Sequence, residues 1–222
     1  MNGEPRFRFL LCDLDNTLYP PDSGLMQAVA QRMVRYMIER VGIPPQAADG
    51  LKRRYFHHYG TTMRGLILHH GIDPEDYLAF VHDLPLEEYI QPNPALDAML
   101  AGIPLRKVVF TNADRAHAER VLGVLGVRRH FEKIIDVRDL NFNSKPHPSA
   151  YRDILDILDA RAEQCIMVED AAANLAPARE IGMFTVLAWN GLAATNDLAD
   201  EADIRIADII HLADAIRPYA YS

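Results

Sequence analysis

Residues 9–20 read Phe-Leu-Leu-Cys-Asp-Leu-Asp-Asn-Thr-Leu-Tyr-Pro. The first four are apolar without interruption, which is the pattern of a strand buried on both faces of a parallel sheet. Asp13 and Asp15 follow directly, at the end of a sheet where open α/β proteins bind ligands. Two carboxylates this close repel each other and require a cation or a shared proton. The alternative is a strand followed by an acidic turn, because Asp and Asn favour turns in any case.

The composition is that of an ordinary globular protein: 222 residues, 49% hydrophobic and 24% charged, with a net charge of −8. This charge argues against a nucleic-acid polymer as partner but leaves room for a small phosphorylated substrate. No apolar run approaches the roughly 18 residues of a membrane span, and Asp13 interrupts the N-terminal run, unlike a signal peptide. We therefore expect a cytoplasmic protein with no membrane partner, whose Cys12 and Cys165 are reduced core thiols.

Residues 19–91 have helical patterns and no good strand pattern. Apolar residues recur at helical spacing over residues 26–41, with Ser23 or Asp22 as the N-cap. Further helices are expected at residues 46–59, at 62–70 and from Pro74 onward, where Asp73 is the N-cap. The sequence thus predicts an all-helical insertion after the first strand.

After residue 91, strand and helix patterns alternate. Strands are predicted at residues 107–111, 133–135, 164–168, 184–187 and, weakly, 204–206. Helices are predicted at residues 93–100, 114–125, 148–158, 175–181 and from His211. Such alternation indicates a parallel, doubly wound sheet. We therefore predict a Rossmann-like α/β core of residues 1–18 and 92–222 and a helical cap domain of residues 19–91.

Three further strand ends carry polar side chains. Thr111 and Asn112 follow the second strand, where a hydroxyl and backbone N–H groups can bind phosphate, although a simple helix cap is the alternative. Lys145, before Pro-His-Pro, can supply a point charge to a phosphate unless it is merely solvated. Glu169 and Asp170 end the fourth strand, and carboxylates at this density suit Mg²⁺.

The order of these motifs resembles that of the haloacid-dehalogenase-like (HAD) hydrolase superfamily: Asp-x-Asp-x-Thr, Thr-Asn, Lys-Pro and Glu-Asp, each at a strand end. The resemblance covers essentially the whole chain, and the helical insertion is similar to the small cap of the first cap class. Within the superfamily, residues 13–20, 59–62 and 110–113 resemble the pyrimidine 5′-nucleotidase group. Glu169-Asp170 departs from the Asp-Asp or Gly-Asp of many members.

The resemblance implies a Mg²⁺-dependent phosphomonoesterase that acts through an aspartyl-phosphate intermediate. Asp13 is the expected nucleophile, and Asp15 the general acid and base, a task for which we expect a raised pKa. The expected metal ligands are Asp13, the backbone carbonyl of Asp15 and Asp170, with Glu169 acting mainly through water.

The resemblance further assigns Thr111, Asn112 and the catalytic Lys145 to the phosphoryl group. Tyr19, just beyond the acidic motif, is expected to stack on a base, and the expected substrates are the pyrimidine nucleoside 5′-monophosphates UMP and CMP. The alternatives are a phosphatase or phosphomutase for another small ester, such as a sugar phosphate or phosphoglycolate, a dehalogenase, or a non-catalytic binding protein. Asp15 speaks against the dehalogenase, because a halide leaving group needs no proton.

Overall fold

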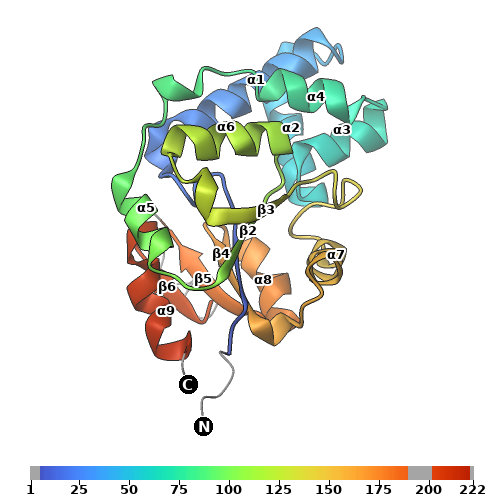
Figure 1. Ribbon diagram of the computed structural model, residues 1–222. Helices are drawn as coiled ribbons and strands as arrows, with labels where there is room; N and C mark the ends of the chain where they lie inside the picture. The colour runs from blue at the N-terminus through green and yellow to red at the C-terminus, as the bar shows by residue number, and fades with distance from the viewer. Residues whose placement is uncertain (1–5, 190–201, 221–222) are drawn as a thin grey trace.

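The computed structural model describes residues 6–189 and 202–220, which contain one parallel sheet (Figure 1). Its strands are β1 (Phe9–Cys12), β2 (Arg106–Phe110), β3 (Phe131–Ile135), β4 (Cys165–Glu169), β5 (Phe184–Ala188) and β6 (Ile204–Ile206). Their order in the sheet is β3-β2-β1-β4-β5-β6. The predicted doubly wound parallel sheet is therefore confirmed.

Helices follow the strands much as the sequence predicts. The segment between β1 and β2 contains α1 (Leu25–Glu39), α2 (Pro45–Tyr59), α3 (Thr62–His70), α4 (Pro74–Val81) and α5 (Pro94–Ala101). The later helices are α6 (Arg115–Leu125), α7 (Pro148–Leu158), α8 (Ala172–Glu180) and α9 (Leu212–Ala220). Residues 19–91, all of which the structure describes, contain no strand. None of the described helices combines the length and apolar character needed to cross a lipid bilayer.

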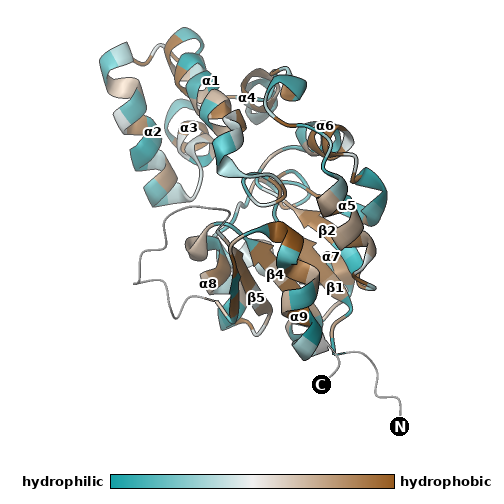
Figure 2. Ribbon diagram, turned by 90° about the vertical axis from the view of Figure 1, so that its left-hand side faces the viewer, coloured by the Kyte–Doolittle hydropathy of each residue, from teal (hydrophilic) through white to brown (hydrophobic). Residues whose placement is uncertain are grey.

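Both faces of the sheet are covered, which explains the uninterrupted apolar sequence of β1. Phe9 and Leu11 pack in a buried cluster with side chains of α7 and α8. Leu10 and Cys12 point to the opposite face, into a cluster with side chains of α5, α6 and α9. Figure 2 shows the strands as an apolar layer between helices. The thiols of Cys12 and Cys165 are free and buried, as predicted.

Helices α1 to α4 supply most of a third buried cluster, which includes Tyr36, Tyr55, Leu66 and Tyr77 and also Val137 from the loop after β3. Figures 1 and 2 show these four helices grouped beyond one end of the sheet. One detail of the prediction is wrong: neither Asp22 nor Ser23 is the N-cap of α1. Both lie in a short 3-10 turn, and the cap position is Gly24, whose left-handed φ of 84° turns the chain into the helix.

Candidate active site

The candidate site lies at the carboxyl ends of β1, β2 and β4. Strand β1 lies between β2 and β4, where the strand order reverses, and open α/β sheets bind ligands at such a point. The Asp13 N–H donates to the Val168 carbonyl at 2.9 Å, which holds the end of β1 against β4. A cavity of about 410 Å³ opens there, within the range of about 300–1,000 Å³ typical of small-molecule sites. Its lining includes Asp13, Thr111 and Glu169 from the sheet edge.

Lys145 lies at the centre of the buried charges. Its Nζ donates to Asp13 Oδ1 at 2.7 Å and to Glu169 Oε1 at 2.8 Å. The side chain is 1% exposed. Burial alone lowers the pKa of Lys145, but the Asp13 and Glu169 carboxylates raise it well above its ordinary value. Lys145 is therefore an ammonium ion bound between two carboxylates.

Asn112 holds the loop that carries Lys145. Its side-chain Oδ1 accepts from the Lys145 N–H at 2.8 Å, and its Nδ2 donates to the Lys145 carbonyl at 3.0 Å. The resemblance assigns Asn112 to the phosphoryl group; Asn112 lines the cavity, and its side-chain amide bonds to the backbone of Lys145. Thr111 lines the cavity as expected, and its Oγ1 accepts from the Ala113 N–H at 3.0 Å.

Asp13, Glu169 and Asp170 each offer a carboxylate oxygen within 4.8 Å of the others. Three carboxylates and the one ammonium of Lys145 give a formal charge of −3 + 1 = −2. Burial raises the pKa of Asp13 to about 7. Burial and the neighbouring Glu169 and Asp13 raise the pKa of Asp170 to about 9. The cluster thus lacks positive charge, and an all-oxygen donor set of this kind fits Mg²⁺.

The two acids at the end of β4 differ in their surroundings. Glu169 Oε1 accepts from Lys145 and from Asn174 Nδ2 at 2.6 Å, and its Oε2 accepts from the Ala171 N–H at 2.9 Å. Glu169 is fully buried and accepts three hydrogen bonds, whereas Asp170 is half-buried, so Asp170 is the better candidate for a direct metal ligand.

Asp15 lines the same cavity but bonds to a different set of partners from the carboxylate cluster. The chain turns after it at Asn16, whose left-handed φ of 62° is one that Asn tolerates better than most residues. Asp15 Oδ1 accepts from the Tyr19 hydroxyl at 2.6 Å and bonds to His117 Nε2 at 3.1 Å. Burial acts to raise the pKa of Asp15, but His117 and Tyr19 outweigh it, so the pKa lies below its ordinary value. The expectation of a raised pKa is therefore wrong for the site without substrate.

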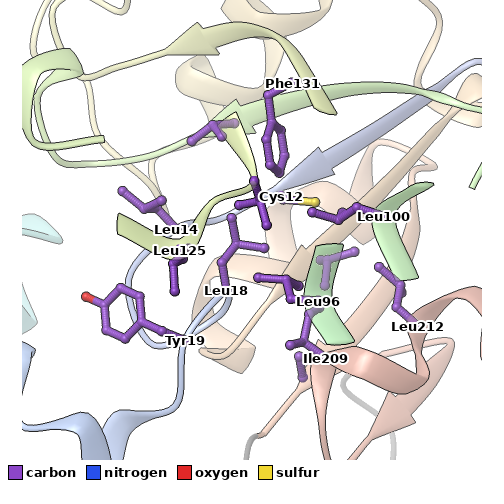
Figure 3. Close-up of a cluster of buried hydrophobic side chains, with 14 of the residues drawn as sticks. Cys12, Leu14, Leu18, Tyr19, Leu96, Leu100, Leu125, Phe131, Ile209 and Leu212 are labelled. Carbon is purple, nitrogen blue, oxygen red and sulfur yellow. The ribbon is translucent and has the colours of Figure 1, made fainter. Parts of the chain in front are cut away.

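Tyr19 is placed differently from the prediction. Its side chain is 1% exposed and packs in the cluster shown in Figure 3, from which the hydroxyl points away. Tyr19 does not belong to the lining of the cavity, so its ring has no access to a substrate base there. The apolar neighbours Leu14 and Leu18 enter the same cluster, and burial of the ring with them explains its position.

Comparison with known proteins identifies the family. A profile described as haloacid dehalogenase-like hydrolase matches residues 7–182. The chain belongs to the haloacid dehalogenase-like hydrolases. This hydrolase is 29% identical over 140 residues to "Phosphate metabolism protein 8" of Saccharomyces cerevisiae, a match that covers 59% of this chain and 44% of the yeast protein. It is 23% identical over 216 residues to "Phosphoglycolate phosphatase" of Aquifex aeolicus, covering 93% and 97% of the two chains.

A third relative of the hydrolase is "Validoxylamine A 7'-phosphate phosphatase" of Streptomyces hygroscopicus subsp. limoneus, 32% identical over 103 residues, or 46% of each chain. The match thus spans less than half of the yeast and Streptomyces proteins. Among solved structures, an HAD phosphatase from Thermococcus onnurineus has a TM-score of 0.66 at 16% identity, covering 96% of this chain and 100% of that one. L-2-haloacid dehalogenase from Xanthobacter autotrophicus has a TM-score of 0.62 at 16% identity, with the same coverage. These structures share the fold of the hydrolase.

The site of this hydrolase also contains two histidines that the sequence analysis does not single out. His117 bonds to Asp15, and the ring of His82 stacks on that of His117 with 4.2 Å between centroids. His82 Nδ1 bonds to Asp114 Oδ2 at 2.6 Å. A signal exists for His117, because it lies in the first turn of a helix that begins at the end of β2. No sequence signal indicates His82, which follows α4 and is 32 residues from Asp114.

The wall of the cavity opposite the sheet comes from the helical insertion of the hydrolase. Met26, Val29 and Met33 of α1 contribute apolar surface. Helix α2 contributes His57 and Phe56, whose side chain is 58% exposed. A ring this exposed inside a site is available to contact a ligand.

Proposed function

We propose that this hydrolase is a Mg²⁺-dependent phosphomonoesterase in which Asp13 forms an aspartyl-phosphate. The observation that carries the proposal is the position of Asp13 at the end of β1, where it faces the cavity, bonds to Lys145 and shares this one cation with Glu169 and the nearby Asp170. The phosphatase names of the Streptomyces and Aquifex relatives support the same reaction class.

Asp13, Asp170 and the backbone carbonyl of Asp15 would hold Mg²⁺, with Glu169 contributing through water. When bound, the ion offsets the repulsion between the carboxylates and the phosphate and withdraws charge from a phosphoryl oxygen.

Asp13 and Asp15 have different roles in the two steps of the reaction. A carboxylate oxygen of Asp13 attacks phosphorus, and the bond to the leaving oxygen breaks as that oxygen takes a proton from Asp15. In the second step Asp15 takes a proton from water, whose oxygen bonds to phosphorus and releases Asp13. The phosphate of the substrate adds negative charge beside Asp15, which favours the protonated form needed first. Lys145 and Thr111 stabilise charge on the phosphoryl oxygens.

We further propose that residues 19–91 act as a cap domain on a core of residues 1–18 and 92–222. Most of the residues in one buried cluster come from four helices of this segment, and several of their side chains line the cavity. Closure of such an element excludes water from the reacting phosphate.

As substrates we propose pyrimidine nucleoside 5′-monophosphates. The cavity offers a polar end at the sheet for a phosphate and an apolar wall from α1 for a ring. Phe56 replaces Tyr19 as the side chain positioned to stack on a base. Pocket contacts of this kind discriminate by about 1–3 kcal/mol, so we expect some hydrolysis of AMP and GMP as well. Another small phosphate ester is the second candidate, because the phosphatases among the relatives are named for esters other than nucleotides.

The test is release of phosphate from UMP, CMP, AMP, GMP, glucose 6-phosphate and phosphoglycolate, in Mg²⁺ and in excess chelator. We expect turnover only with the metal, the highest kcat/KM for UMP or CMP, and no turnover by Asp13→Asn. Full turnover with chelator, with the absence of metal verified, would contradict the metal assignment. If kcat/KM for another ester exceeds that for UMP and CMP by tenfold or more, about 1.4 kcal/mol, the nucleotide assignment fails and the phosphatase assignment stands.

A further inference from the structure

One oxygen of Asp15 is bonded from two separate segments of the chain. The Tyr19 hydroxyl donates to Asp15 Oδ1 at 2.6 Å from the loop after β1. His117 Nε2 lies 3.1 Å from the same oxygen, at a separation of 102 residues. The imidazole of His117 has a side-chain exposure of 0%. Two bonds from different directions restrict rotation of the Asp15 carboxylate.

The surroundings of His117 define which of its nitrogens carries the proton. Nδ1 is buried and has no hydrogen-bond partner among the described residues. A proton on Nδ1 alone would be buried without an acceptor, so we place a proton on Nε2, from which the ring donates to Asp15. The Tyr19 hydroxyl and the His117 N–H then both point at Oδ1.

The His117 ring is itself held in place. The His82 ring lies against it at 4.2 Å between centroids and 19° between planes. Asp114 accepts from His82 Nδ1 at 2.6 Å and from the backbone N–H of His117 at 2.9 Å. The carbonyl of His82 accepts from Arg120 at 3.0 Å, on the same helix as His117. Packing and hydrogen bonds thus hold the His117 ring in place from the side opposite to Asp15.

We propose that His117 is a positioning residue which, with Tyr19, occupies Asp15 Oδ1 and so directs Oδ2 toward the reacting phosphate. This inference rests on the proposed function. The proton that reaches the leaving oxygen then comes from Oδ2 as the bond from phosphorus to that oxygen breaks, and the proton removed from water returns to Oδ2. His117 acts through Asp15 and does not itself belong to the lining of the cavity.

A purely structural histidine makes a different prediction from a positioning one. If His117 only packs α6 against the sheet, its loss lowers turnover of every substrate alike. If it positions a general acid, its loss matters most for substrates whose leaving oxygen needs a proton. An alkoxide is a poor leaving group and needs that proton, whereas 4-nitrophenolate leaves readily without it.

The experiment measures kcat/KM for 4-nitrophenyl phosphate and for the alkyl phosphate that the wild type hydrolyses best. For each substrate, kcat/KM reports the steps up to departure of the leaving group. For His117→Leu we expect a loss of about tenfold or more on the alkyl phosphate and under about threefold on 4-nitrophenyl phosphate, a part of the roughly 10²–10⁴-fold that general acids contribute. His117→Gln, whose amide reaches the position of Nε2, should recover most of the loss. His117→Asn, whose amide is too short, should not.

Equal losses on both substrates, or no recovery with Gln, would overturn the inference. If His117→Leu does not fold, as judged by circular dichroism, His117→Asn and Tyr19→Phe give the same test, and both should show the selective loss. An Asp15→Asn enzyme with the selective loss, beside His117 variants without it, overturns only the positioning role. Two results would overturn the proposed function and this inference together. One is a wild type without phosphatase activity, and the other is an Asp15→Asn enzyme that hydrolyses both esters as well as the wild type does.

Discussion

The ammonium group of Lys145 lies 2.7 Å from a carboxylate oxygen of Asp13, although 132 residues separate the two in sequence. The same nitrogen lies 2.8 Å from Glu169. The loops after β1 and β3 and the end of β4 are therefore joined by one buried cation. Because breaking a buried ion pair leaves an unpaired charge in the interior, the position of Lys145 has consequences for both stability and activity.

Replacing Lys145 by Gln removes this cation and leaves three carboxylates without it. We expect the free energy of unfolding without metal to fall by about 3–5 kcal/mol, as in other broken buried ion pairs. We expect kcat/KM to fall by about 10²-fold or more, because the preorganised cation bonded to Asp13 is lost. Urea unfolding and steady-state kinetics measure the two effects. Lys133→Gln is the matched control, since Lys133 is exposed on β3 and both properties should stay unchanged. A Lys145→Gln enzyme with more than half the wild-type kcat/KM would show that Lys145 has no catalytic role.

Asp13 and Asp15 should differ in a trapping experiment. Of these two residues, only Asp13 bonds to Lys145 and lies in the carboxylate cluster, so Asp13→Asn should form no phosphoenzyme. Asp15→Asn should bind substrate nearly as well as wild type but turn over about 10²–10⁴-fold more slowly, the usual contribution of a general acid or base. Acid quenching followed by intact-protein mass spectrometry detects the added phosphoryl group. Phosphate trapped on Asp13→Asn, or full activity of Asp15→Asn, would reverse the assignment.

Gly60 ends α2 where it meets the loop of Lys145. A Cβ at Gly60 would lie 2.9 Å from Pro146 Cδ and 3.1 Å from the Lys145 carbonyl oxygen. Gly71 ends α3 with a similar positive φ but has no atom within 4 Å of its Cβ position. Ala at either position costs about 1–2 kcal/mol for the left-handed conformation. We expect only Gly60→Ala to displace Lys145 and to lower kcat/KM, by about tenfold. Equal kcat/KM values for the two variants would exclude this contact as a constraint on the site.

Phe56 should matter for ring-containing substrates. Its ring is 58% exposed and lines the cavity. Stacking of an aromatic ring on a base is worth about 1–3 kcal/mol, so Phe56→Ala should lower kcat/KM for UMP by roughly 5- to 150-fold. For glycerol 3-phosphate, which has no ring to stack, the same substitution should change kcat/KM by less than about twofold. Leu68→Ala is the control, because Leu68 is 53% exposed and lies outside the cavity lining. Equal losses on both substrates would indicate that Phe56 does not contact a base.

Asp114 should stabilise the protein in a pH-dependent way. Burial acts to raise the pKa of Asp114, but hydrogen bonds from His82 and from the backbone of His117 outweigh it and hold the pKa at about 2, against 3.8. A carboxyl whose pKa is depressed on folding adds stability above its unfolded pKa and loses it as the pH falls toward the folded value. We expect Asp114→Asn, which can still cap α6, to be less stable than wild type by about 2 kcal/mol at pH 6. Urea unfolding should show this difference shrinking between pH 4 and pH 2. A difference that does not change over this range would rule out the charge of Asp114 as its source.

The sequence determines the fold because the decisive signals are local. Four apolar residues ended by Asp13 specify a doubly buried strand, and the alternation of such strands with helices leaves a parallel sheet as the natural arrangement. In that arrangement all strands end at one edge. Asp13, Thr111 and Glu169 therefore meet there, although no local interaction joins them. The grouping of these three strand-end residues thus follows from the order and direction of the strands.

Only the tertiary structure decides where each side chain points. Asp13 and Asp15 are two residues apart, yet one bonds to Lys145 and the other to His117. Tyr19, expected in the pocket, supports Asp15 from within an apolar cluster, because its ring is more stable buried and only its hydroxyl reaches the site. Hydrophobic periodicity indicates which residues are buried but not which polar atom of a distant helix lies within hydrogen-bond distance of them. That choice depends on the packing of elements far apart in the chain, and a single sequence carries no local signal for it.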